Sequence, residues 1–318
     1  MLKQYRTRLA NVRVLVGASE VNFRRALADG LRSQGFQSIH PFAEFELLAD
    51  DLRAHMPDLV IMDADFRGGD VIGLVQDIRH RRIGHNPFVA IILTAWHPDE
   101  QRVRELLVSG VDGLLVMPVS MDKVLDRVAE IAFNRKPFIV TGDYLGPERR
   151  RGDRASELPQ VEVPNTLLMK ASGKEVSAHL LSAEIDRTME ALHTATIERL
   201  GEHVVTRVGH ILAAFQAKKI DQDLKVRLER LAGLVESARR LTRGRPYPHI
   251  DNLCRALNEV VLSILRQVNK PAPEDLKLLK PLATAVALTL AQGNKSDLVA
   301  NQIAALVASF EARRRKTG

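Results

Sequence analysis

Oxygen-bearing side chains follow several short apolar runs in the first part of the chain. Asp63 and Asp65 stand at the end of one run, Thr94 ends another, and Glu20 comes shortly after a third. Magnesium binds sites built of oxygen atoms and usually takes one or two carboxylates together with water. Asp63, helped by Glu20 or by a carbonyl near Asp65, is therefore a weak candidate for a Mg²⁺ site.

The apolar runs have the pattern of buried strands, and amphipathic helices are expected between them. The predicted strands cover residues 12–16, 38–42, 59–62, 90–93 and 114–116. Five strands that alternate with five helices through short connections predict an α/β fold with a doubly wound parallel sheet. In such a sheet, ligands bind at the carboxyl ends of the strands. We therefore expect Asp63, Thr94 and Met117 to share one edge.

Three segments of this region resemble the receiver domain of response regulators, including the chemotaxis type. They are PDLVIMDADFRGGDVIGLVQDIR (57–79), AIILTA (90–95) and GVDGLLVMPVS (110–120). The likeness covers about residues 11–133 and includes the order of the segments. It implies that Asp63 is the phosphoacceptor, that Thr94 holds the hydroxyl position, and that Pro118 belongs to the usual Lys-Pro pair.

The same resemblance implies that several receiver residues are missing. The acid pair that binds Mg²⁺ in receivers falls on Ala18 and Ser19, with Glu20 next to them, and the usual lysine is Met117. Leu114 stands at the position of the aromatic switch residue. A phosphoryl group brings about two negative charges at pH 7, and its transfer needs nearby cations. The pattern therefore favours a pseudo-receiver that serves as a docking surface.

The character of the sequence changes over residues 134–175, which are rich in Gly, Pro and Arg. Within this segment, GPERRR resembles a tail that follows the receiver in some alphaproteobacterial response regulators. The planar guanidinium groups of Arg149, Arg150 and Arg151 suit carboxylates and phosphates. Two interpretations stay open: a basic solvated linker, or an arm that binds an acidic surface or folds back on a receiver.

The last part of the chain has helical periodicity throughout. Helices are expected over 176–219, 221–242, 250–268 and 273–292, followed by one that Ser296 would cap. A helix of ~40 residues exceeds the average of ~11–12 and needs a partner, either in a bundle or in a homodimer. We therefore divide the chain into a receiver-like domain (1–133), a basic extended linker or arm (134–175) and an all-α helical bundle (176–318).

Composition limits the classes of function. Apolar residues make up 45% and charged residues 27%, as in folded proteins. Cys254 is the single cysteine, which excludes an intramolecular disulfide and a Cys-based zinc site. The chain shows neither a secretory signal nor an apolar stretch of ~20 residues, so we expect a cytoplasmic protein. The net charge of +7 favours acidic partners, anionic lipid or nucleic acid.

Three functions compete. The first is a non-enzymatic signalling adaptor without a cofactor, which regulates a partner such as a histidine kinase or another regulator by contact. The second is a working response regulator that is phosphorylated on Asp63 with Mg²⁺. The third is a nucleic-acid-binding regulator that uses the arginine patches. No helix-turn-helix with a basic recognition helix stands out, so the first function is favoured.

Overall fold

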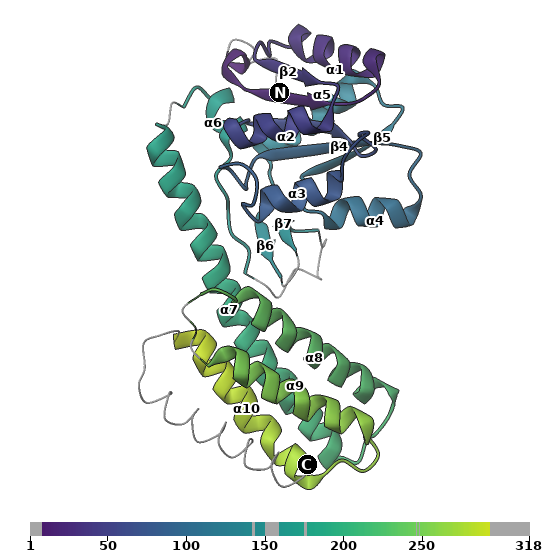
Figure 1. The fold of residues 1–318 in the computed structure, drawn as a ribbon, viewed down its shortest axis with the longest axis vertical. Helices are drawn as coiled ribbons and strands as arrows, with labels where there is room; N and C mark the ends of the chain where they lie inside the picture. Colours follow the sequence, from purple (N-terminus) through teal and green to yellow (C-terminus); the bar gives the residue numbers. More distant parts are fainter. Residues whose placement is uncertain are drawn as a thin grey trace. The chain divides into compact units, whose positions relative to one another are not determined.

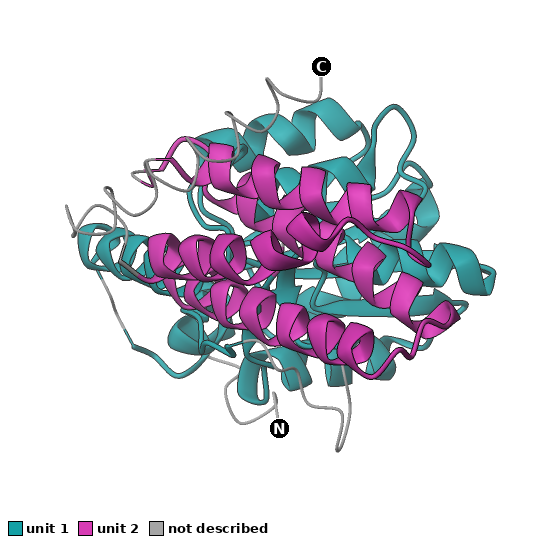
Figure 2. Ribbon diagram, turned by 90° about the horizontal axis from the view of Figure 1, so that it is seen from below, with its two compact units in different colours: residues 1–140, 144–192 teal, residues 141–143, 193–318 magenta. Residues whose placement is uncertain are grey.

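The computed structural model describes residues 8–141, 144–149, 159–174, 177–245, 247 and 249–292. Arg150, Arg151 and the helix expected after Ser296 lie outside the described residues. The chain divides into two compact units, which Figure 2 colours teal and magenta. The first unit contains residues 1–140 and 144–192, and the second contains residues 141–143 and 193–318.

The first unit is built on a five-stranded sheet with the order β2-β1-β3-β4-β5 (Figure 1). The strands are β1 (Val14–Gly17), β2 (Ile39–Phe42), β3 (Leu59–Asp63), β4 (Ala90–Trp96) and β5 (Gly113–Met117). All neighbouring strands run parallel. The chain passes from β1 to β2 on one side and then to β3 on the other side, so the strand order reverses at β1. The predicted doubly wound parallel sheet is confirmed.

Helices cover both faces of this sheet. One face packs against α1 (Val21–Ser33) and α5 (Met121–Phe133). The other face packs against α2 (Phe45–Ala54), α3 (Val71–Arg79) and α4 (Glu100–Val108). This three-layer arrangement buries the central strands β1 and β3 almost completely and explains why their sequences are continuous apolar runs.

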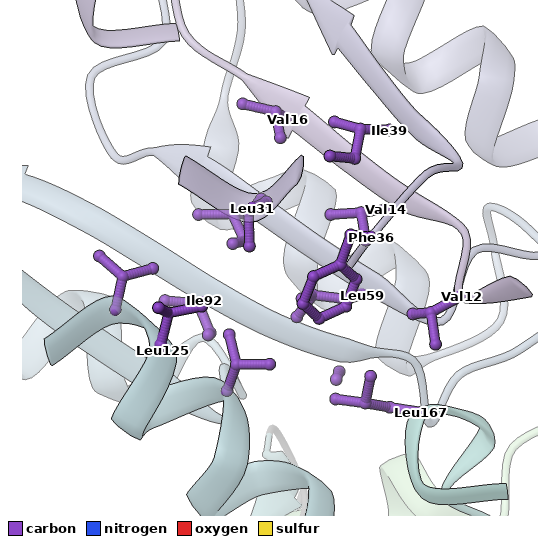
Figure 3. Packing of buried hydrophobic residues seen from close by; sticks show 14 of the residues in the cluster. Val12, Val14, Val16, Leu31, Phe36, Ile39, Leu59, Ile92, Leu125 and Leu167 are labelled. Atoms are coloured by element: carbon purple, nitrogen blue, oxygen red, sulfur yellow. The ribbon is translucent and has the colours of Figure 1, made fainter. Parts of the chain in front are cut away.

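Alternation along each strand divides the core into two clusters, because successive side chains of a strand point to opposite faces. Val14 and Val16 lie in the cluster beneath α1 and α5, whereas Leu15 lies in the cluster beneath α2 and α3. Figure 3 shows the first cluster, in which Phe36 lies among the β-branched and leucine side chains. The Leu167 side chain joins the same cluster although it is distant in sequence.

The described part of segment 134–175 has more structure than the extended linker or arm that we expected. It contains an antiparallel hairpin of β6 (Phe138–Val140) and β7 (Leu145–Pro147), followed by helix α6 (Thr166–Ala171). The Asn165 side chain caps α6 by accepting a hydrogen bond from the Leu168 amide. This segment was difficult to predict because strands of three residues show too little alternation to be recognised.

The remaining helices are α7 (Ala178–Gln216), α8 (Gln222–Leu241), α9 (Ile250–Arg266) and α10 (Pro273–Gln292). The 39-residue helix α7 begins in the first unit and ends in the second. Within the second unit its apolar stripe is buried, and the other three helices supply buried side chains of their own. The predicted helical part is confirmed, and Pro281 lies inside a continuous α10. Among the described residues, no helix is both long and apolar enough to cross a membrane.

Candidate functional site

Asp63 and Thr94 lie side by side at the carboxyl edge of the parallel sheet. They are paired in the register of β3 and β4, and the amide of Ala64 donates to the Thr94 carbonyl oxygen at 2.7 Å. The Thr94 side chain is buried, and its hydroxyl donates to the Met62 carbonyl oxygen at 3.4 Å. The structure thus brings these two predicted site residues together, but the Thr94 hydroxyl group donates its hydrogen bond to a backbone carbonyl and not to Asp63.

The Asp63 carboxylate is partly shielded from water. Loss of solvation raises its pKa above the usual range, and hydrogen bonds from the backbone of Asp65 and Ala64 oppose this only in part. The Asp65 amide donates to Asp63 Oδ1 at 3.2 Å. Among the described residues, no arginine or lysine pairs with Asp63. Asp63 is therefore a partly desolvated carboxylate that no cation in the described part of the chain offsets.

The residues after β1 supply no carboxylate to Asp63. Ala18 is fully buried and has no polar side-chain atom. Glu20, the one acid of this loop, is the N-cap of α1 and accepts hydrogen bonds from the amides of Asn22 and Phe23. Those bonds, the one from Phe23 first, lower the pKa of Glu20. A capping carboxylate of this kind satisfies the free amides of the first helical turn, so Glu20 already has a structural role.

An arginine holds the carbonyl groups of the same loop. Arg24 extends from α1, and its Nη1 donates to the carbonyl oxygens of Ala18 and Ser19, the latter at 3.2 Å. The Ser19 hydroxyl oxygen accepts a hydrogen bond of 3.0 Å from the amide of Arg67. A hydrogen bond therefore joins the loops after β1 and β3, at the position where receivers usually have two acidic residues.

A second arginine reaches this edge from α4. Arg102 Nη2 lies 3.1 Å from Asp65 Oδ1 and 3.3 Å from the carbonyl oxygen of Ala64. Sequence reasoning missed both this residue and Arg24, because an arginine in the first turns of an amphipathic helix looks like any solvated surface residue. The single sequence signal is their position, shortly after the ends of β1 and β4.

Met117 ends β5 and is paired with Trp96 in the register of the sheet. Its side chain is only 6% exposed, so the position of the receiver lysine is apolar and closed to water. The peptide bond between Met117 and Pro118 is cis. Trp96 is 47% exposed and packs edge-to-face against Phe23, with ring centroids 6.2 Å apart. At this edge of the sheet, apolar side chains therefore stand where receivers usually have a lysine.

The donor set at this edge does not fit a magnesium ion. Asp63 offers one carboxylate, while Asp65 is paired with Arg102 and Glu20 caps a helix. Among the described residues, no three His, Cys, Asp or Glu side chains are grouped so that they could hold a metal ion. Mg²⁺ needs several oxygen atoms at near-octahedral positions. Arg102 and Arg24 already bind carboxylate and carbonyl oxygens at this edge that such an ion would require.

The predicted arginine patch is described only at Arg149. Its side chain is half-buried, and its Nη2 donates to the carbonyl oxygen of Val111, the residue that precedes the loop into β5. Leu145 and Gly146 of the hairpin pack directly against Gly110. The described part of the arm therefore folds back on the receiver of the same chain, which answers the question that the sequence left open for this residue.

Comparison with known families agrees with this geometry. Residues 14–129 match the family model of the response regulator receiver domain. Residues 14–129 therefore form a receiver domain, the kind of domain that two-component signalling systems use.

Two kinds of relatives extend the comparison. The transcriptional regulatory protein PdtaR of Mycobacterium tuberculosis is 26% identical over 194 residues, which cover 59% of this chain and 91% of that protein. Among solved structures, chemotaxis response regulator CheY4 of Vibrio cholerae is 17% identical, covers 38% of this chain and 98% of its own, and has a TM-score of 0.35. The receiver domain of the Francisella response regulator 1452 is 19% identical, covers 37% and 94%, and has a TM-score of 0.34.

Proposed function

We propose that this protein is a pseudo-receiver adaptor, which regulates a signalling partner by contact and does not use Asp63 as a phosphoacceptor. The partner belongs to the class that receivers contact, a histidine kinase or another regulator. In this proposal the chain catalyses no reaction of its own and needs no Mg²⁺. The observation that carries the proposal is the capping role of Glu20, since it removes the last acid of the β1 loop from the neighbourhood of Asp63.

Electrostatics supports the proposal. A phosphoryl group carries about two negative charges at pH 7, and catalysis of its transfer consists mainly of positioning and of stabilising these charges with cations. At this edge the lysine position is the buried Met117, and Arg24 is held by backbone carbonyls. A phosphoryl group on Asp63 would therefore stand beside an apolar side chain, with its charge poorly balanced.

One observation favours the second function, a working response regulator. Arg102 lies 3.1 Å from Asp65, close enough to the edge to turn toward a phosphoryl group. Its side chain is 35% exposed, so it has room to change rotamer. If Arg102 replaces the missing lysine, Asp63 accepts phosphate, and removal of Arg102 abolishes that reaction.

The deciding experiment measures phosphorylation by intact mass. The chain is incubated with Mg²⁺ and acetyl phosphate, alone and as the triple variant Ala18→Asp, Ser19→Asp, Met117→Lys, which restores the missing receiver residues. We expect no phosphoryl adduct on the native chain and an adduct on the triple variant. Adding Asp63→Asn to the triple variant is the matched control and should remove the adduct.

An adduct on Asp63 of the native chain would overturn the pseudo-receiver proposal. In that case Arg102→Ala distinguishes the routes, because loss of the adduct would assign the compensating charge to Arg102. Absence of an adduct on both the native chain and the triple variant would instead show that the fold of this edge, rather than the missing residues, prevents the reaction. That result would contradict the electrostatic argument.

The nucleic-acid alternative draws support from the relative PdtaR, which is a transcriptional regulatory protein, and from the net charge of +7. Against it stands Arg149, whose guanidinium group binds the receiver backbone. Binding to generic DNA as a function of salt tests this alternative. A steep fall of affinity with rising salt supports it, and a failure to bind at low salt removes it.

The homodimer stays a separate proposal. The apolar stripe of α7 that favoured a coiled-coil partner is buried within a single chain at Leu200, Val204 and Val208. A dimer would therefore use another surface. Light scattering over a range of protein concentrations measures the mass directly, and a constant monomer mass would exclude the dimer.

A further inference from the structure

A strongly basic cavity lies in the second unit, between the C-terminal end of α8 and the first turn of α9. Its volume is about 500 Å³, within the range of small-ligand pockets. The lining is mainly polar, and its cationic and aromatic members are Arg239, Arg240, Arg243, Arg245, Tyr247 and His249. The sequence analysis assigned no function to this loop, and the receiver domain has no part in it.

Two carboxylates, Glu236 and Asp251, contact arginines at this cavity. Glu236 binds Arg239 through contacts of 2.9 and 3.0 Å and lies 3.9 Å from Arg240. Asp251 lies 3.3 Å from Arg239 and 2.6 Å from Arg255. The lining of the cavity holds four arginines, Arg239, Arg240, Arg243 and Arg245, and one acid, Asp251. The formal charge of these lining groups is therefore positive.

Arg243 is the arginine that is most available to a ligand. Its side chain is exposed, and among the described residues its guanidinium group has no hydrogen-bond or ion-pair partner. It follows Thr242, the buried C-cap of α8, which fixes the backbone at this point. Gly244 then turns the chain with a φ of 74°. The helix cap and the turn place Arg243 in the lining of the cavity.

The geometry selects a multiply charged ligand. Each guanidinium group is a planar fork that binds phosphate oxygens in pairs, and four arginines line the same cavity. A carboxylate would satisfy one of them, whereas adjacent phosphates would satisfy several. The first turn of α9 also faces the cavity and adds a smaller favourable potential for anions, but the arginines carry the argument.

We propose that the α8–α9 cavity is a binding site for a soluble small molecule that carries a diphosphate group. Its volume of about 500 Å³ favours a small molecule over a nucleic acid, whose backbone needs an extended basic track. The site would give the helical unit an input that does not depend on the receiver. The proposal therefore stands or falls independently of what happens at Asp63.

The experiment is a calorimetric titration of the full chain with inorganic pyrophosphate at fixed ionic strength. The test variant is Arg243→Glu, which removes no existing contact. The matched control is Arg266→Glu. Arg266 is exposed and is the last residue of α9, so its backbone lies about 24 Å from the first residue of that helix at a rise of ~1.5 Å per residue. Both variants change the net charge equally, and thermal unfolding of each checks the fold.

We expect saturable binding to the native chain, a loss of about tenfold or more in affinity for Arg243→Glu, and little change for Arg266→Glu. No saturable binding to the native chain would overturn the proposal. Equal weakening by both variants would also overturn it, because it would indicate attraction by net charge alone. The proposal would also be overturned if a single-stranded oligonucleotide or anionic vesicles bind to the chain and pyrophosphate does not displace them.

Discussion

Arg79 and Asp112 form an ion pair in the interior of the first unit, with 2.9 Å between Nη2 and Oδ2 and side-chain exposures of 0% and 2%. Arg79 Nε also donates to the carbonyl oxygen of Gly110, and Nη1 donates to those of Pro87 and Val89. Burial lowers the pKa of Arg79 to about 10, which still leaves it charged at neutral pH. Such an arginine can be buried because each of its three side-chain nitrogen atoms has a hydrogen-bond partner.

Arg135 binds the same carboxylate from the other side, with Nε 2.7 Å from Asp112 Oδ1. Burial opposes the ionisation of Asp112, but the charges of Arg135 and Arg79 outweigh it and hold its pKa below the usual range. Asp112 also accepts a hydrogen bond from the amide of Ile91, in the neighbouring strand. One carboxylate therefore joins α3, the end of α5 and the sheet.

The first prediction concerns Asp112→Asn. This change keeps the shape of the side chain but leaves two buried guanidinium groups without their counter-charge, so we expect a loss of about 3–5 kcal/mol in the free energy of unfolding. Urea denaturation followed by the fluorescence of Trp96, the single tryptophan, reports on the first unit. The control is Asp77→Asn, which breaks an exposed pair with Arg82 and should cost less than about 1 kcal/mol. Similar losses in both variants would contradict the prediction.

The second prediction concerns the hairpin that follows the receiver. The Phe138 ring is fully buried, with the guanidinium carbons of Arg79 and Arg135 5.3 and 4.9 Å from its centroid. It also packs edge-to-face on Phe88 at 5.7 Å. The hairpin thus covers the buried ion pair and excludes water from it.

Phe138→Ala should therefore destabilise the first unit by about 3–5 kcal/mol, the usual cost of removing a buried aromatic ring. Phe138→Leu keeps most of the apolar volume and loses the cation–π contacts, so its cost should be smaller, about 1–2 kcal/mol. Both are measured by the same fluorescence-detected denaturation. If Phe138→Ala left the stability of the receiver unchanged, the hairpin would not stabilise the receiver and the prediction would be wrong.

The sheet could be predicted from the sequence because each strand is recognised from a few neighbouring residues alone. Each strand of the receiver is a short apolar run bounded by turn residues, and the ends of those runs place Asp63 and Thr94 at one edge without any knowledge of side-chain contacts. The missing carboxylates at Ala18 and Ser19 were likewise visible from position alone. The long helix was visible from its lack of proline.

The arginine roles could not be predicted, because the burial of an arginine depends on groups that are distant in sequence. Arg79 was visible only as the last residue of the receiver-like segment 57–79, yet its partners come from residues 87–112. Arg24 and Arg102 look solvated by periodicity, and their contacts at the sheet edge depend on loops from other strands. The same holds for Glu20, which we considered as a metal ligand and which caps a helix.

The third prediction concerns the protonation of Asp63. Its folded-state pKa is raised, mainly by loss of solvation, so the unfolded chain ionises first as the pH rises and the carboxylate destabilises the fold at neutral pH. Asp63→Asn should raise the stability at pH 7 by roughly 0.5–1 kcal/mol after solvent screening. The gain should shrink as the pH falls toward about 4, the unfolded value.

Thermal unfolding at pH 7 and near pH 4 measures this gain. Asp65→Asn is the matched control, because Asp65 lies two residues away, is paired with Arg102 and has a side chain that is 66% exposed. Its loss should be neutral or destabilising. A destabilised Asp63→Asn chain at pH 7 would mean that a cation compensates Asp63, which would also weaken the pseudo-receiver proposal.

The fourth prediction uses Cys254, which lies on the buried face of α9 in the second unit. Burial, with a smaller contribution from the charge of Asp251, raises the pKa of this thiol to about 12. Only the thiolate reacts with disulfide reagents. At pH 8 the native thiol should therefore react roughly a thousandfold more slowly than an unfolded one, whose pKa is ~8.5.

The measurement is the rate of reaction with a chromogenic aromatic disulfide, in buffer and in denaturant. Leu180→Cys in a Cys254→Ala chain places a thiol at a site that is 61% exposed, and this thiol should react at the rate of a free cysteine. Since the native reaction requires opening of the helical unit, any ligand that binds its closed form slows it further. Pyrophosphate should therefore protect Cys254, three residues after Asp251 at the basic cavity, and Arg243→Glu should remove that protection. Fast labelling of the native chain would instead show that α9 opens readily.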